Sequence, residues 1–207
     1  MVLVKICGIT TLDDALAAVA AGADALGFNF YRRSARFIEP LEARKVIGQL
    51  PSEVLSVGVF VNEHTPEQVA RVADEAGVGA IQLHGDESPE YCWALEGRRV
   101  IKALRVSDDF SPESAKEFRA EAIMLDAYDP KARGGTGRVF DWNIARRTRE
   151  LVPRLFLAGG LSPENVREAI AIVGPYAVDA CSSLESAPGR KDPRLVRAFI
   201  RACREAS

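Results

Sequence analysis

The chain has 207 residues, of which 47% are hydrophobic and 27% are charged, and its formal net charge at pH 7 is −2. This balance is typical of a folded globular protein and excludes an intrinsically disordered chain, which combines low hydrophobicity with high net charge. It also argues against a surface for nucleic acid or for an anionic membrane, because both require an excess of basic residues.

The cysteines and the amino-terminal segment indicate the cellular compartment. The four cysteines have no CxxC spacing and no cluster with histidine, so neither a disulfide framework nor a structural zinc site is expected. The first residues lack the apolar stretch of a signal peptide, and no apolar run approaches the ~20 residues of a transmembrane helix. We therefore expect a cytoplasmic protein with reduced thiols and no membrane partner.

Short runs rich in Val, Ile, Leu and Phe recur along the whole chain, and amphipathic stretches of helical period separate them. Strands that alternate with helices in this way indicate a parallel sheet. We expect strands near residues 2–7, 25–30, 55–61, 80–84, 99–105, 122–127, 154–159 and 177–182. The helical stretches include residues 66–76, 143–151 and 163–173.

The predicted helices have regular start and stop signals. A hydroxyl residue, a proline and a glutamate stand in succession at four places, where the hydroxyl is expected to cap the helix and the proline to occupy its first position. These places begin at Thr65, Ser88, Ser111 and Ser162. Gly22 and Gly77 each precede a predicted strand and suit the left-handed end of a helix.

Eight strand–helix units predict a single (β/α)8 barrel domain over residues 1–207. The alternative is a doubly wound open sheet that binds a dinucleotide. That fold carries a GxGxxG fingerprint after its first strand, where this chain has residues 7–11, CGITT. No Walker A loop is present either, so the closed barrel is the better interpretation.

Two candidate catalytic groups stand at the ends of predicted strands, which is where barrel enzymes place their active sites. Cys7 ends the first strand, and the helix that begins near Thr10 is expected to favour its thiolate, a competent base or nucleophile. The alternative is an inert buried thiol. Asp126 ends the sixth strand, where desolvation favours the protonated acid. Its alternative role is to orient the following loop.

A phosphate site is predicted after the seventh and eighth strands, the usual position in such barrels. Gly159 and Gly160 offer bare backbone that leads directly into a helix, and Ser182 and Ser183 add hydroxyl donors. The alternative is a plain tight turn.

Three further side chains are candidates for substrate contact. Arg36, in the long loop after the second strand, could hold a carboxylate through its two-pronged guanidinium, or it could be a solvated loop arginine. His84 could act as an acid, a base or a hydrogen-bonding group, although a structural role is commoner. The second histidine, His64, is not at ligand spacing, so no metal site is expected. Lys5 shares a strand face with Cys7, and inside the barrel it would need an acidic partner such as Asp179; the alternative is that its side chain extends to water at the bottom of the barrel.

As a set, seven segments along the chain closely resemble the phosphoribosylanthranilate isomerase family of tryptophan biosynthesis. They are residues 5–10 (KICGIT), 22–28 (GADALGF), 34–38 (SARFI), 82–85 (QLHG), 125–126 (LD), 135–142 (GTG at 135–137 and FDW at 140–142), and 157–161 (LAGGL). The resemblance implies a (β/α)8 barrel that converts N-(5-phosphoribosyl)anthranilate to 1-(2-carboxyphenylamino)-1-deoxyribulose 5-phosphate by an Amadori rearrangement. It also implies that no metal or organic cofactor takes part. The sequence is compatible with a monomer or a homodimer.

The resemblance also implies roles for particular residues. Cys7 would be the general base and Asp126 the general acid, while Arg36 would bind the anthranilate carboxylate. Asp179 would contact the sugar and His84 the substrate. The phosphate would be held after strands seven and eight by Gly159, Gly160, Ser182 and Ser183.

One segment departs from the family pattern. Where the family usually has DVSSGVE, residues 179–185 are DACSSLE. Ser183 replaces a glycine, which would be costly if that position requires a positive φ. Cys181 replaces a serine beside Cys7, so a disulfide between them is conceivable, although a buried reduced thiol is the simpler expectation. Two other functions stay open.

The first is another sugar-phosphate barrel isomerase, such as the histidine-pathway enzyme. That enzyme uses two aspartates as its acid–base pair, so Cys7 at the end of the first strand argues against it. The other is a non-catalytic phosphate-binding barrel.

Overall fold

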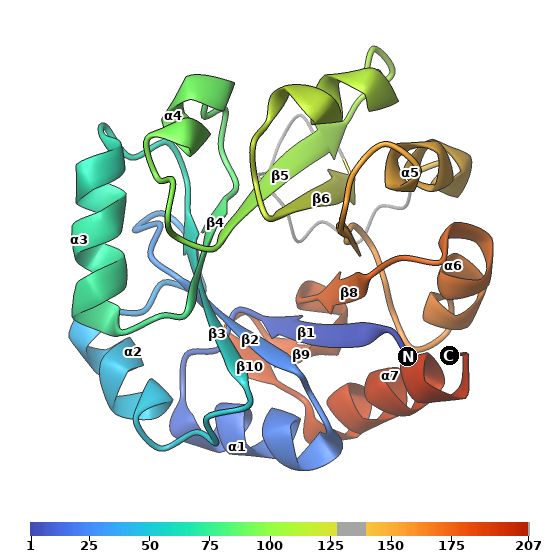
Figure 1. Ribbon diagram of the computed structural model, residues 1–207. Helices are drawn as coiled ribbons and strands as arrows, with labels where there is room; N and C mark the ends of the chain where they lie inside the picture. The colour runs from blue at the N-terminus through green and yellow to red at the C-terminus, as the bar shows by residue number, and fades with distance from the viewer. Residues whose placement is uncertain (128–139, 207) are drawn as a thin grey trace.

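The computed structural model describes residues 1–127 and 140–206, and in it eight parallel strands close into a barrel (Figure 1). The first and last strands pair directly, with Leu3 opposite Ala177 and Ile6 opposite Ala180. The strands are β1 (Leu3–Cys7), β2 (Ala25–Asn29), β3 (Leu55–Phe60), β4 (Ala80–Leu83), β5 (Val100–Val106), β6 (Ala122–Ala127), β7 (Leu155–Leu157) and β8 (Ala177–Ala180). The predicted (β/α)8 architecture is therefore confirmed.

Helices surround the barrel in chain order (Figure 1). They are α1 (Leu12–Ala21), α2 (Pro40–Ile47), α3 (Pro66–Ala76), α4 (Pro89–Trp93), the 3-10 helix η1 (Pro112–Glu117), α5 (Trp142–Arg149), α6 (Val166–Val173) and α7 (Pro193–Glu205). After β8 come the 3-10 helix η2 (Ser182–Leu184) and a small hairpin of β9 (Glu185–Ala187) and β10 (Arg190–Lys191). Arg204 of α7 donates to the Val2 carbonyl at 2.8 Å, which ties the last helix to the first strand.

Two of the four predicted helix starts are confirmed. The hydroxyls of Thr65 and Ser88 accept backbone N–H groups at the starts of α3 and α4. At Ser111 the prediction is confirmed in part: Pro112 is the first residue of the 3-10 helix η1, but the Ser111 hydroxyl donates to Glu113 and does not cap the backbone. Ser162 also does not begin a helix. Asn165 bonds both the Ser162 N–H and the Gly160 carbonyl, which holds this stretch as a loop, so that α6 begins at Val166.

The helix ends at Gly22 and Gly77 agree with the prediction. Their φ angles are 100° and 72°, in the left-handed region that glycine adopts without strain. Each glycine N–H bonds carbonyls of the preceding turn and closes its helix. Within the described part of the chain, no helix is both long enough and apolar enough to cross a membrane.

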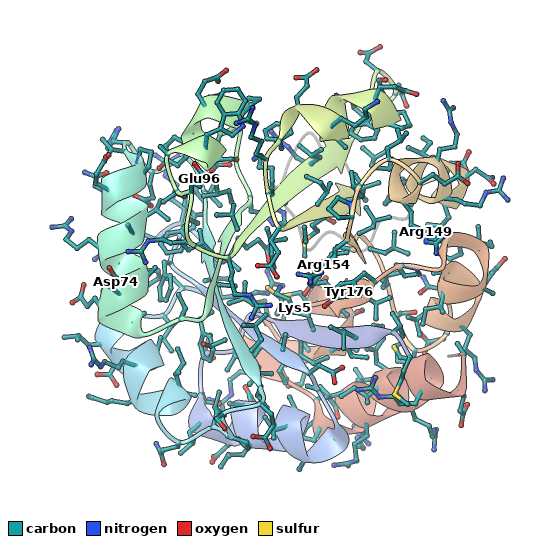
Figure 2. The ribbon with its side chains drawn as sticks, viewed as in Figure 1. Lys5, Asp74, Glu96, Arg149, Arg154 and Tyr176 are labelled. Carbon is teal, nitrogen blue, oxygen red and sulfur yellow. The ribbon has the colours of Figure 1, made fainter. Side chains whose placement is uncertain are left out.

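The barrel interior contains small side chains at its amino-terminal end. β2, β4, β6 and β8 each contribute an alanine there, namely Ala25, Ala80, Ala122 and Ala177. Barrel interiors are usually filled by branched side chains, so four alanines leave space. A cavity of about 270 Å³ occupies it and extends past Lys5 to Arg154 and Tyr176. Figure 2 shows these last three residues near the middle of the barrel, while Asp74 and Glu96 lie at the periphery.

Filling this cavity should stabilise the fold. We expect Ala122→Val to raise the free energy of unfolding by about 0.5–1 kcal/mol, because the added methyl groups occupy empty space and valine suits a strand. Ala180→Val is the matched control, because this β8 alanine faces the closely packed layer between the sheet and its helices. That variant should be destabilised by about 1–3 kcal/mol. Urea denaturation measures both variants, and equal losses would contradict the cavity as the cause.

Candidate active site

The carboxyl end of the barrel brings together most of the side chains that the sequence singled out. Cys7 and Asp126 lie on β1 and β6, Asp179 lies on β8, and His84 follows β4 directly. All four are largely buried, with Cys7 exposed by 8% and Asp126 by 5%. Parallel strands that end at one mouth converge there, which is why residues far apart in the sequence become neighbours.

Lys5 and Asp179 form an ion pair inside the barrel, as predicted. Lys5 Nζ donates to Asp179 Oδ1 at 2.7 Å, and the lysine side chain is fully buried. Burial raises the pKa of Asp179 to about 6, against the opposing effect of Lys5. Burial alone would lower the pKa of Lys5, but the nearby carboxyl of Asp179 and thiol of Cys7 raise it, so the ammonium persists. The mouth therefore contains a fixed positive charge beside Cys7.

The Cys7 thiol has a pKa well below its ordinary value, mainly because the Cys181 thiol hydrogen-bonds to it. The positive charges of Lys5 and Lys191 also favour the thiolate, while burial acts in the opposite direction. The predicted thiolate is thus supported, but its predicted cause is not. Helix α1 begins only at Leu12, after the cap residue Thr11. The largest lowering of the Cys7 pKa comes from the Cys181 thiol and not from the end of this helix.

The low pKa of Cys7 leads to a reactivity prediction. Iodoacetamide should alkylate Cys7 rapidly at pH 7, because a lowered pKa keeps the thiolate present as the pH falls through the neutral range. Cys181→Ala removes the largest cause and raises that pKa, so alkylation should slow at pH 7 and become equal to wild type near pH 10. Cys181→Ser keeps a hydrogen-bond donor and should restore the rate. Mass spectrometry assigns the site, since burial raises the pKa of Cys92 to about 11.

If alkylation at pH 7 were as fast in Cys181→Ala as in wild type, the bond from Cys181 would not be what stabilises the thiolate. If the rate in wild type fell steeply below pH 8.5, as for an ordinary thiol, the lowered pKa itself would be contradicted.

Asp126 is held on both carboxyl oxygens. Oδ1 accepts the Ala127 N–H at 2.9 Å, and Oδ2 lies 3.1 Å from His84 Nε2. A side chain at Gly159, whose φ is 83°, would place its Cβ 3.0 Å from Asp126 Oδ1 and against the Ala127 backbone. Glycine at 159 is therefore needed for the close approach of the β7 loop to Asp126.

Arg36 lies at the mouth but is already paired. Its Nε and Nη2 donate to the two carboxylate oxygens of Glu185 at 2.8 and 2.7 Å, and this pairing raises the pKa of Arg36. Lys191 also donates to Glu185, at 3.0 Å. A Cβ on Gly8 would lie 2.7 Å from the Arg36 Cδ, so the missing side chain at Gly8 lets the arginine cross the end of β1.

The predicted phosphate region differs from expectation in two ways. Gly159 and Gly160 both have positive φ but lead into the loop before α6, because α6 begins at Val166. Ser183 lies in η2, and its φ is not positive, so the expected strain from replacing glycine is absent. Its hydroxyl donates to the Leu161 carbonyl at 2.5 Å and so links the two loops. Among the described residues, the backbone N–H groups of Gly160, Ser182 and Ser183 have no hydrogen-bond partner.

Sequence reasoning missed Glu185, Lys191 and Gln82. Glu185 and Lys191 belong to the small hairpin after β8; Glu185 ends the segment 179–185 that was compared with the family pattern, but neither residue was assigned a role. Gln82 could have been found, because it lies two residues before His84 on the same strand face. The predicted motif at residues 135–137 lies outside the described residues. In the part of the chain that the structure describes, no three His, Cys, Asp or Glu side chains are grouped as metal ligands.

The fold and the buried thiol and carboxyl groups at its mouth define a (β/α)8-barrel enzyme. Residues 4–202 match the family model described as N-(5'phosphoribosyl)anthranilate (PRA) isomerase. The chain belongs to this family, which acts in tryptophan biosynthesis. Its curated relatives include the N-(5'-phosphoribosyl)anthranilate isomerase of Trichlorobacter lovleyi, 53% identical over 206 residues with both chains fully covered.

Solved structures agree with this assignment. The chain is similar to the phosphoribosyl anthranilate isomerase of Thermotoga maritima, with 46% identity, a TM-score of 0.93, and 99% and 100% of the two chains covered. A second similar structure is that of such an isomerase in complex with reduced 1-(o-carboxyphenylamino)-1-deoxyribulose 5-phosphate. It is 45% identical with a TM-score of 0.89 over 99% of this chain and 100% of that one.

Proposed function

We propose that this protein isomerises N-(5-phosphoribosyl)anthranilate to 1-(2-carboxyphenylamino)-1-deoxyribulose 5-phosphate, with Asp126 as general acid and Cys7 as general base. These roles are supported best by the presence of both groups, Cys7 and Asp126, at the same end of the barrel. Cys7 has a lowered pKa, which suits it to accept a proton, and Asp126 is fixed by hydrogen bonds to both of its carboxyl oxygens. The two groups come from β1 and β6 and can reach the sugar from different sides.

In the proposed mechanism, Asp126 protonates the ring oxygen of the ribose while the C1′–O bond breaks, which leaves an iminium at C1′. The iminium acidifies the C2′ proton, and the Cys7 thiolate removes it to give an enolamine. The enolamine then tautomerises to the ketone: C1′ gains a proton, the C2′ hydroxyl loses one, and these two transfers return Cys7 to the thiolate and Asp126 to the acid. Because the iminium is the electron sink, the reaction needs no metal or organic cofactor.

The binding groups divide between the two ends of the substrate. Arg36, oriented by Glu185, would meet the anthranilate carboxylate, and Asp179 would contact the sugar. The backbone N–H groups of Gly160, Ser182 and Ser183, which have no partner among the described residues, are suited to a phosphate, together with the backbone of Gly159. The contact from Ser183 to Leu161 would hold the two phosphate loops at a constant separation.

The test mixes purified protein with freshly prepared phosphoribosylanthranilate and follows the loss of its fluorescence, with the product identified by mass spectrometry. Turnover that continues in the presence of EDTA supports both the reaction and its independence from a metal. Binding without turnover by the folded protein would overturn the isomerase proposal and favour a binding role.

A further inference from the structure

The polar contacts of Asp126 lead to a buried side chain, Gln82, that the proposed mechanism does not use. Gln82 of β4 is 1% exposed, and its amide Nε2 lies 2.7 Å from His84 Nδ1. His84 Nε2 in turn faces Asp126 Oδ2 at 3.1 Å. Gln82, His84 and Asp126 therefore form a continuous chain of polar side chains, from the barrel interior to the proposed acid.

The chemistry of the groups gives this chain a direction. An amide nitrogen only donates, so Gln82 Nε2 requires Nδ1 of His84 to be the unprotonated, accepting nitrogen. A neutral imidazole then carries its proton on Nε2 and donates it to Asp126 Oδ2. Gln82 thus determines which hydrogen bond His84 offers to the carboxyl group.

The orientation of the Gln82 amide is itself constrained. Nε2 also contacts Met124 Sδ at 3.4 Å, whereas Oε1 is buried without a hydrogen-bond partner in the described structure. Turning the amide over would place two N–H donors where that oxygen now has no partner. An unsatisfied buried polar group is destabilising, so keeping one unpaired oxygen costs less than leaving two unpaired donors.

We propose that Gln82 is a positioning residue for the isomerisation: its buried amide fixes the tautomer of His84, and His84 thereby holds the carboxyl group of Asp126. The claim that Gln82 affects catalysis rests on the proposed role of Asp126 as general acid. The claim about the tautomer of His84 does not depend on that role. Once Asp126 has given up its proton, donors from His84 and from the Ala127 backbone stabilise the carboxylate on both oxygens. Gln82 acts only through His84.

The tautomer can be measured directly, because the sequence has only two histidines. His64→Gln removes the exposed one, so that ¹⁵N-histidine labelling reports on His84 alone. Protonated and unprotonated ring nitrogens have well separated ¹⁵N frequencies. At pH 8 we expect the proton on Nε2 in this background. A proton on Nδ1 would overturn the proposal without any variant of Gln82 being needed.

Variants then connect the tautomer to catalysis. Gln82→Met keeps an unbranched side chain but removes the donor, and we expect the Nε2–H tautomer to lose its dominance and kcat to fall about 10–100-fold with KM little changed. Gln82→Glu provides only an acceptor to Nδ1 and should reverse the tautomer. Gln68→Met is the matched control, since Gln68 on α3 also has a buried, unpartnered amide oxygen but lies outside the site.

The outcomes separate the two proposals. A wild type that never turns over would overturn the proposed function, while the NMR measurement would still decide the tautomer. A changed tautomer with unchanged kcat in Gln82→Met would overturn the positioning role. An equal loss of kcat in Gln68→Met would show that the effect is not specific to this chain of side chains.

Discussion

Cys7→Ser and Asp126→Asn should each lower kcat by about 10²–10⁴-fold, the usual contribution of a general base or acid. Serine is nearly isosteric with cysteine, but its hydroxyl does not ionise near neutral pH, so the proton acceptor is lost. Asparagine fills the same space as aspartate and has no acidic proton to give to the ribose ring oxygen. KM should change little, because both variants retain the shape of the site. The measurement is the decay of phosphoribosylanthranilate fluorescence at saturating substrate.

Matched controls come from the same residue types outside the mouth. Cys92→Ser on α4 and Asp74→Asn on α3 change equivalent groups and should keep kcat within about twofold, provided that circular dichroism shows both to be folded. If either site variant retained a tenth or more of wild-type kcat, its residue would not be the acid or base. If Asp126→Asn raised KM with kcat unchanged, Asp126 would serve in binding instead.

Much of the fold could be predicted from the sequence, because barrel strands and helices have distinct periods. All eight strands were predicted within a few residues of their observed bounds, from Leu3–Cys7 to Ala177–Ala180. Cys7 and Asp126 could then be selected because each ends a predicted strand, and the carboxyl ends of all strands in such a barrel lie at the active-site end. The ion pair between Lys5 and Asp179 followed from alternation along a strand.

The remainder depended on contacts that local sequence does not encode. Arg36 meets Glu185 across 149 positions of the chain, and that pairing exists only because the barrel closes. The cause of the low pKa of Cys7 was misassigned for the same reason, since Cys181 lies on the opposite end of the sequence. The strain expected at Ser183 depended on a backbone angle, which η2 provides in the ordinary region.

Lys5→Met should lower the free energy of unfolding by about 3–5 kcal/mol at pH 8, the usual cost of removing one partner of a buried ion pair. Methionine has a similar unbranched shape, so little of the loss comes from a new cavity. The carboxylate of Asp179 would remain inside the barrel without its counter-charge, 2.7 Å from the space that Nζ occupied. For a chain of this size the melting temperature should fall by roughly 10 °C.

Lys45→Met is the matched control. Lys45 donates to Glu42 at 2.6 Å, a geometry as close as that of the buried pair, but both side chains are well exposed. Exposed pairs contribute about 0–1 kcal/mol, so this variant should unfold almost as wild type does. Equal losses of unfolding free energy in the two variants would show that the buried Lys5–Asp179 pair stabilises the fold no more than an exposed pair does.

The loss in Lys5→Met should also depend on pH. Asp179 has a pKa of about 6 in the folded wild type, above its ordinary value, so the folded state retains a proton that the unfolded state has released between about pH 4 and 6. Stability from this group therefore falls as the pH rises through that window. Without Lys5 the folded pKa rises further, and stability continues to fall above pH 6.

The difference between wild type and Lys5→Met should accordingly be smaller at pH 5, where Asp179 is protonated in both proteins, and larger at pH 8. Urea denaturation at the two pH values measures it, with Lys45→Met showing no such trend. A difference that stayed constant from pH 5 to pH 8 would mean that Lys5 stabilises the barrel through packing of its side chain and not through its charge opposite Asp179.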